Sequence, residues 1–124
     1  MTPLEIGALV LGGGLGAGAR YIVDGLVTRG RKDAFPLGIL IVNVIGSFLL
    51  GLFTGIPQFT GVWLAVLGTG LLGGFTTFSA VSVESVLLAR RGRRDWAWTN
   101  LLGTLGACLI AAALGLLIGG LFPR

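Results

Sequence analysis

The stretch GGFTTFS, residues 73–79, interrupts the most apolar part of the chain. Two adjacent glycines, two adjacent threonines and a serine are poor formers of a continuous helix. Residues 34–83, which surround the stretch, contain no charged side chain. As one helix they would be about twice as long as a ~30 Å hydrocarbon layer requires. The segment must therefore turn back and form two membrane spans, with GGFTTFS inside the second of them.

The composition is that of a membrane protein. Of the 124 residues, 54% are hydrophobic and only 11% are charged, whereas soluble domains carry about 25% charged residues. The net charge of +4 does not indicate nucleic-acid binding, because the basic residues lie at the ends of apolar runs. The chain has no histidine, and its single cysteine, Cys108, excludes an internal disulfide and a CxxC metal site.

Four spans with short connections account for the apolar pattern. The stretch TGIPQFTG (54–61) supplies glycine, proline and glutamine for the reversal. Pro36 suits a first helical turn, and Trp96 and Trp98 suit a membrane interface. The N-terminus lacks the basic region of a signal peptide, so we expect the first segment to remain as a span. The sequence thus predicts one all-α transmembrane domain with spans at roughly 4–27, 36–56, 61–89 and 96–122 and a break in the third.

The 23 glycines indicate close packing of the spans. Many are four residues apart, which lets helix backbones approach where the hydrophobic effect gives no driving force. Four short helices enclose little space by themselves, so we expect the chain to form oligomers. The glycine pairs with this spacing are Gly12 and Gly16, Gly14 and Gly18, Gly51 and Gly55, Gly70 and Gly74, and Gly115 and Gly119.

Basic residues are concentrated on one side of the predicted membrane. The loops after the first and third spans carry seven, and the opposite side carries only Arg124. The positive-inside rule therefore predicts that both termini lie outside the cytoplasm. The seven residues are Arg29, Arg31, Lys32, Arg90, Arg91, Arg93 and Arg94.

A helix interrupted at Gly73–Gly74 would leave backbone carbonyl and amide groups without partners at membrane depth. Such groups are tolerated only when they are buried in protein, hydrated or bound to an ion. Freed carbonyls suit a hard cation, and the N-terminus of the following half-helix favours an anion. A kink stabilised by threonine hydroxyls is the alternative that needs no ligand.

Polar side chains within the second and fourth spans are further candidates. Asn43 needs a partner, because a lone amide in hydrocarbon costs several kcal/mol. It either joins two helices or donates to a passing anion. Asn100, Thr104 and Cys108 recur every fourth residue on one helix face. They form either a polar track along a pore or an ordinary packing seam.

Aromatic and charged residues complete the set of candidates. Phe75 and Phe78 flank the threonines and either fill the core or present electropositive ring edges to a small anion. Arg20 and Asp24 are spaced to pair with each other. Charges within spans often mark pathways. Arg20 and Glu84 nevertheless lie near helix ends, where they can also reach the headgroups.

Sequence signals for an enzyme are missing. The chain shows no paired carboxylates, no Ser–His constellation and no phosphate loop after a strand. The glycines of LGGGLGAGAR (11–20) do not form a dinucleotide-binding fingerprint in a strand–helix context. We therefore expect no enzymatic activity.

Three stretches resemble the signature sequences of the Fluc/CrcB family of small bacterial fluoride channels. They are GGFTTFS (73–79), VNVIGSFLLG (42–51) and GAGARY (16–21), and the resemblance extends over the whole chain. It implies an antiparallel dimer in the bacterial plasma membrane, with two narrow pores through which fluoride leaves the cytoplasm passively. It also implies a structural sodium ion at the dimer centre, held by the backbone carbonyls of Gly73 and Thr76.

The same resemblance assigns residues to the fluoride pathway. The pore asparagine of the family matches Asn43, the first pore phenylalanine matches Phe78, and the arginine of the first span, at the pore vestibule, matches Arg20. A pore for small, strongly hydrated fluoride must replace water with donors and still let the ion leave. The other pathway residues implied are Ser79, Glu84, Asn100, Thr104 and Cys108.

Two features depart from the family pattern. Many relatives read TTFSTF where this chain reads TTFSAV, so Val81 replaces the second phenylalanine. An antiparallel homodimer also requires a chain that inserts in both orientations, whereas the basic residues here are biased seven to one. Both features favour pairing with an oppositely oriented homologue over pairing with itself.

Two other functions stay open at this point. A small multidrug-type exporter also uses four short helices, but it needs a carboxylate deep in the first span. Here Glu5 lies at the edge of that span, and the next acid is Asp24. A poorly conducting assembly subunit would keep the glycine packing and would need neither Asn43 nor the break at residues 73–76.

Overall fold

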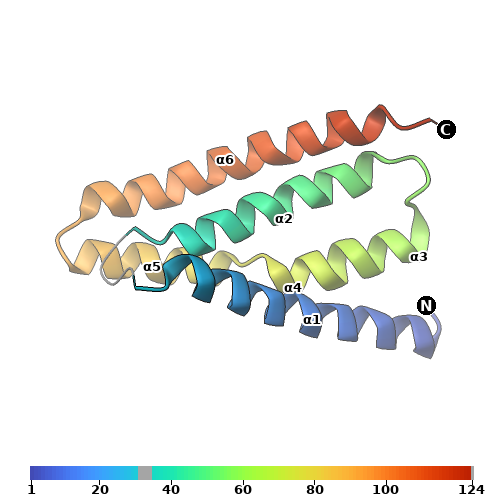
Figure 1. Cartoon of the computed structure of the whole chain (residues 1–124), viewed down its shortest axis with the longest axis horizontal. Coiled ribbons are helices and arrows are strands. Elements are labelled where there is room, and N and C mark those ends of the chain that lie inside the picture. Colours follow the sequence, from blue (N-terminus) through green and yellow to red (C-terminus); the bar gives the residue numbers. More distant parts are fainter. Residues whose placement is uncertain (31–34, 124) are drawn as a thin grey trace.

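The computed structural model describes residues 1–30 and 35–123, which form a bundle of helices (Figure 1). Within these residues, four helical segments are long and apolar enough to cross a membrane, which confirms the predicted fold class. The third segment, Gly61–Arg90, contains the break. The elements are α1 (Pro3–Thr28), α2 (Leu37–Gly55), α3 (Gly61–Leu64), η1 (Ala65–Leu72), α4 (Gly73–Phe75), α5 (Phe78–Arg90) and α6 (Arg94–Gly120).

Local sequence signals set several helix ends. Thr2 caps α1, because the Glu5 N–H donates to its hydroxyl at 3.2 Å while the Thr2 N–H donates to the Glu5 carboxylate at 2.9 Å. Gly61, the first residue of α3, and Gly92, in the loop after α5, have φ angles of 63° and 77°. Glycine adopts this left-handed backbone without the strain that a Cβ would bring.

The chain runs up and down the bundle. Both termini and the turn between α2 and α3 lie at one end (Figure 1). The loop between α5 and α6, which carries Arg91 and Arg93, lies at the other. Helix α2 packs along α6, and α1 packs along η1 and α4. Of the residues that define the predicted charge bias, Arg31, Lys32 and Arg124 lie outside the described residues.

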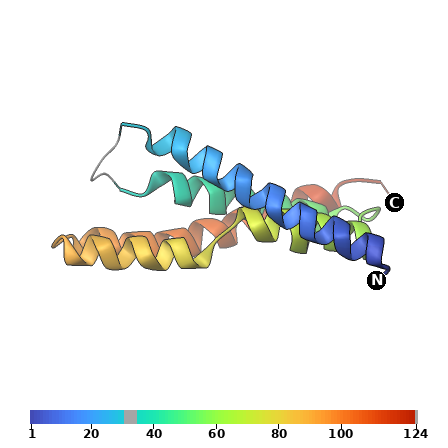
Figure 2. The ribbon, with the colours of Figure 1, turned by 90° about the horizontal axis from the view of Figure 1, so that it is seen from below.

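Glycines bring the backbones of neighbouring helices into contact, as the small-residue spacing predicts. A Cβ at Gly16 would overlap the carbonyl oxygen of Leu71, and one at Gly74 would overlap that of Gly13. Figure 2 shows the resulting crossing of α1 over the third span at α4. By contrast, a Cβ at Gly14 or Gly18 would meet nothing within 4 Å, so this pair packs against no part of the described chain.

The third span is broken at Thr76 and Thr77. Thr76 (φ −82°, ψ 158°) and Thr77 (φ −152°, ψ 128°) are extended, whereas Gly73 (φ −63°, ψ −37°) is helical. The prediction of a break is confirmed, but its predicted position at Gly73–Gly74 is wrong. Packing of Gly74 against the α1 backbone holds the glycines in the helix. The threonines bear hydroxyls that bond to nearby backbone outside a regular helix.

The eight residues that precede Gly73 form a π-helix, η1. Such turns are rare, and inside longer helices they often lie near functional sites. Here the π-helix leads directly to the contact with α1 and the break.

Replacement of Gly16 by alanine tests the contact between α1 and the third span. The new methyl group would meet the Leu71 carbonyl and would lie 2.8 Å from the Phe75 backbone nitrogen, and neither can rotate away. We expect Gly16→Ala to lower stability by about 1–3 kcal/mol. Gly7→Ala, on the same helix with nothing within 4 Å of its Cβ, is the control. Thermal unfolding in detergent checks this, and equal midpoints for the two variants would contradict the contact.

Candidate functional site

The break removes the regular hydrogen-bond donors from several carbonyl groups in the third span, those of Gly73 and Thr76 among them. In a continuous α-helix the Thr77 N–H would donate to the Gly73 carbonyl. Instead it donates to Oδ1 of Asn43 at 2.8 Å. The Ala80 N–H, which would serve the Thr76 carbonyl, donates to Oγ1 of Thr77 at 3.2 Å. The carbonyls of Gly73 and Thr76 therefore lack the donors that a helix would give them.

Asn43 of α2 bridges the break. Its Nδ2 donates to the Thr77 carbonyl at 3.0 Å, while its Oδ1 accepts from the Thr77 N–H. The residue is 6% exposed. Of the two sequence interpretations, joining two helices is thus what the side chain does here. An asparagine amide has two N–H hydrogens, and the described hydrogen bonds use one, so donation to an anion stays compatible with this geometry.

Gly46 makes room for the other threonine of the break. A Cβ at Gly46 would overlap Cγ2 of Thr76. The Thr76 hydroxyl and N–H both donate to the Leu72 carbonyl, each at 2.9 Å. Asn43 and Gly46 are three residues apart and share one face of α2. Asn43 therefore contacts Thr77 while Gly46, one helical turn further along α2, contacts Thr76.

A pocket of about 430 Å³ lies beside the break. Its polar lining includes Ser47, Thr76 and Thr77, and its apolar lining includes Leu101 and Leu105. The lining side chains are all neutral. Four residues of the predicted fluoride pathway also line it, namely Asn43, Phe78, Thr104 and Cys108.

The predicted polar stripe of α6 divides between this pocket and a helix contact. Thr104 and Cys108 line the pocket. Asn100 is 1% exposed, and its Nδ2 donates to Oγ of Ser85 at 2.9 Å and to the Val81 carbonyl at 3.3 Å. Thr104 in turn donates to Oδ1 of Asn100 at 3.5 Å. The stripe is therefore a column of hydrogen bonds that joins α6 to α5 and ends at the pocket.

The aromatic positions have different environments. Phe75 is 9% exposed and packs in the core, whereas Phe78 is 81% exposed and lines the pocket from its edge. Val81, at the position where many relatives have a second phenylalanine, is 4% exposed and also lines the pocket. A ring at that position would therefore border the same space.

Three other predicted site residues do not line this pocket. Ser79 is exposed, with its Oγ 3.3 Å from Oγ1 of Thr77. Glu84 and Arg20 are half-buried, and neither forms a hydrogen bond or ion pair within residues 1–30 and 35–123. The expected pairing of Arg20 with Asp24 is accordingly not formed there.

Sequence reasoning missed Ser47 and Ser85 as parts of the site. Ser47 follows Asn43 by one helical turn, so the i, i+4 rule that identified the α6 stripe would also have found it. Ser85 follows Val81 by one turn, and its hydroxyl donates to the Val81 carbonyl at 2.8 Å. No pattern in the sequence links it to Asn100.

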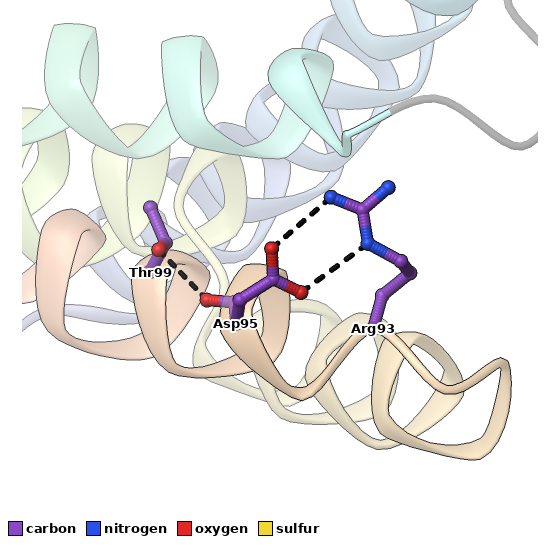
Figure 3. A network of polar contacts seen from close by, with 3 residues as sticks. All are labelled: Arg93, Asp95 and Thr99. Carbon is purple, nitrogen blue, oxygen red and sulfur yellow. Dashed lines mark hydrogen bonds and ion pairs between the residues drawn. The ribbon is translucent and has the colours of Figure 1, made fainter.

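Another polar cluster lies at the start of α6 (Figure 3). Nε and Nη2 of Arg93 donate to the two carboxylate oxygens of Asp95 at 3.2 and 3.1 Å. The Thr99 hydroxyl donates to the Asp95 backbone carbonyl at 2.8 Å. The Arg93 guanidinium also lies 3.7 Å from the centre of the Trp96 ring. Arg93 and Asp95 thus compensate each other's charge at this end.

Comparisons with known proteins find one family, and the matches cover almost the whole chain. A family model described as "CrcB-like protein, Camphor Resistance (CrcB)" matches residues 7–116. The "Fluoride-specific ion channel FluC 1" of Leifsonia xyli is 45% identical over 98% of this chain and 90% of its own. The protein of that name from Rubrobacter xylanophilus is 41% identical over 93% of each chain. The "Fluoride-specific ion channel FluC" of Opitutus terrae is 42% identical over 86% of each.

Asn43→Leu tests the bridge across the break. Leucine has a similar size but leaves the half-buried N–H of Thr77 without a partner, at about 1–3 kcal/mol. It also removes one of the donors to the Thr77 carbonyl, which as the N-cap carbonyl of α5 keeps its intrahelical bond. Ser47→Ala is the control, because Ser47 lines the same pocket and forms no hydrogen bond with the described residues. We expect Asn43→Leu to unfold at a clearly lower temperature than Ser47→Ala. Coincident unfolding curves would show that Asn43 does not hold the break.

Proposed function

The chain belongs to the CrcB-like protein family, and on this premise we propose that it is a fluoride-specific ion channel. The observation that carries the proposal is the similarity, over nearly the full length, to relatives that bear this name. The four apolar helical segments fit a multi-pass membrane protein. The pocket beside the break supplies a place where the ion could pass.

The pocket has the chemistry that passage of fluoride requires. The ion is small and strongly hydrated, so donors must replace its water without holding it too tightly. We infer that the second N–H of Asn43, the thiol of Cys108 and the ring edge of Phe78 provide these contacts. The hydroxyl of Thr104 joins them when it turns from its 3.5 Å bond to Asn100 toward the ion. Because the lining is neutral, no fixed cation traps the ion, and fluoride leaves the cytoplasm passively, down its gradient.

Completion of the pathway requires a second subunit. Phe78 and Ser79 lie on the exposed surface of the single chain, at the depth of the break. An antiparallel partner laid over this surface would enclose Phe78 and bring further groups to the pocket. Arg20, Glu84 and Asn100 would then act at the approaches to the pocket, Asn100 through its hydrogen bond with Thr104.

The partner we propose is an oppositely oriented homologue. The seven-to-one bias of basic residues favours one orientation, with both termini outside the cytoplasm. Val81 supplies no ring to the pocket that it lines. A homologue with the opposite bias and an aromatic residue at the matching position would complement both features. A self-paired antiparallel dimer is the alternative.

The break also fits a structural sodium ion. The carbonyls of Gly73 and Thr76 lack their helical donors, and backbone carbonyls are ligands that replace the hydration shell of an alkali cation. Gly73 is exposed, so its carbonyl can face a partner subunit. When bound, sodium would supply a positive charge that satisfies these oxygens at membrane depth. The two residues would hold it through the main chain, so their side chains need no charge.

Fluoride efflux from liposomes tests the proposed function. We expect release of fluoride, measured with an ion-selective electrode, and no release of chloride. Thr104→Val keeps the side-chain shape but removes from the pocket the hydroxyl that can turn from Asn100 to the ion, and should slow efflux about tenfold. Thr99→Val is the matched control, because Thr99 is exposed on α6 and bonds only to its own helix backbone.

Two arms of this experiment decide the assembly. If the chain is active only with an oppositely oriented homologue, the heterodimer is supported. Full activity of the chain alone would contradict the heterodimer and leave the channel function intact. If neither preparation releases fluoride, the channel function itself is contradicted.

Sodium removal tests the proposed cation site. A ligand that binds only the folded protein at 100 times its dissociation constant stabilises it by about 2.7 kcal/mol. We therefore expect the purified assembly to unfold at a lower temperature when N-methylglucamine replaces sodium at equal ionic strength. Identical unfolding in the two salts would contradict a structural sodium ion.

A further inference from the structure

A second groove lies between α5 and α6, toward the end of the bundle that carries the α5–α6 loop. It has a volume of about 510 Å³. Helix α6 contributes Arg94, Ala97, Trp98 and Leu101, an i, i+3, i+4, i+7 set that shares one face. Small and aliphatic residues of α5 form the opposite wall. The groove is thus mostly apolar and has an arginine at its mouth. Its α5 wall includes two serines, Ser82 and Ser85, whose hydroxyls donate to the backbone of their own helix.

The mouth carries positive charge without a compensating acid. A smaller pocket of about 360 Å³ shares part of the α5 wall and adds Arg90. Arg90 and Arg94 are exposed, and neither forms a hydrogen bond or ion pair with another described residue. The neighbouring acid, Asp95, already accepts both hydrogen bonds of Arg93 (Figure 3). Glu84, the acid of α5, lines neither pocket.

Along α6 the residues that line the groove change from charged to aromatic to aliphatic. A phospholipid changes in the same order, from its charged headgroup through the interface to its acyl chains. Trp98, 62% exposed, lies about 6 Å beyond Arg94, and Leu101 lies about 10 Å beyond it, at 1.5 Å per residue. Arginine and tryptophan are typical of the membrane interface, where the side chain of arginine reaches the phosphates. Leucine lies where the acyl chains begin.

We propose that this groove binds an anionic phospholipid from the leaflet at the basic end of the bundle. The phosphate lies between the guanidinium groups of Arg94 and Arg90, which donate in a planar fork that suits phosphate oxygens. The first part of one acyl chain lies between α5 and α6 and reaches Leu101. Basic pockets between membrane helices select anionic headgroups in this way. A zwitterionic lipid binds less well, because its own ammonium offsets the phosphate.

The lipid site adjoins the proposed fluoride pathway, since Ser85 of its α5 wall accepts a hydrogen bond from Asn100, but it is a different space from the pocket beside the break. Leu101 borders both the groove and the pocket beside the break, so the acyl chain ends at the side chain between the two spaces. Bound lipid would fix the α5–α6 hairpin relative to the leaflet without entering the pocket. Lipid binding therefore does not depend on fluoride conduction.

Native mass spectrometry of the full-length protein in detergent tests the proposal. Dioleoyl phosphatidylglycerol should bind at least about fivefold more tightly than dioleoyl phosphatidylcholine, and Arg94→Ala should reduce that affinity about tenfold. Arg29→Ala, which removes an exposed charge outside the groove at the C-terminal end of α1, should leave it unchanged. Ala89→Phe fills the groove but keeps both arginines, and should also reduce binding.

Several results would overturn the proposal. Equal binding of the two lipids, or equal losses in Arg94→Ala and Arg29→Ala, would show no specific phosphate site. Normal lipid binding by Ala89→Phe would show that no acyl chain lies in the groove.

Glycerol phosphate that binds as tightly as the lipid would indicate a free-phosphate site. Loss of fluoride efflux by Ala89→Phe in pure phosphatidylcholine would assign the groove to the ion path. If Arg94→Ala does not fold, Arg90→Ala and Ala89→Phe decide the question.

Discussion

Two hydrogen bonds between the Asn43 side chain and the backbone N–H and C=O of Thr77 hold the site together. Inside a membrane an unpaired peptide group costs several kcal/mol, so a helix cannot simply stop there. With its one side-chain amide, Asn43 bonds both the N–H and the C=O of Thr77, which belong to two successive peptide groups. The third span can therefore become extended at Thr76 and start again at Phe78. The freed carbonyls, the pocket and the exposed position of Phe78 all follow from this exchange of partners.

Much of the fold could be predicted from the sequence, because the membrane restricts the choices. The uncharged residues 34–83 require a reversal, and the glycine spacing predicts backbone contacts that Gly16 and Gly74 make. The position of the break could not be predicted in this way. Glycine has low helix propensity everywhere, yet Gly73 and Gly74 stay helical because α1 packs against Gly74. That is a tertiary contact, which local sequence does not report.

The site could be predicted only in part for a similar reason. The i, i+4 periodicity predicts that Asn100, Thr104 and Cys108 share one face of a helix. They do, because α6 is a continuous α-helix. It could not show that Ser85 of α5 covers Asn100 while Thr104 and Cys108 stay at the pocket. The polar character of Asn43 was evident, but its partner lies 34 residues away in the chain. Residue type identified the candidates, and only the packing of helices assigned their partners.

The π-helix η1 bears on how the third span can vary among related sequences. A π turn closes its hydrogen bond over five residues where an α turn uses four, so it accommodates one additional residue. A deletion within residues 65–72 could then be absorbed by conversion of a π turn to an α turn. The register downstream would be preserved, with Gly74 still against α1 and Thr77 still opposite Asn43. A deletion between Gly74 and Thr77 could not be absorbed in this way, because these residues contain no π turn.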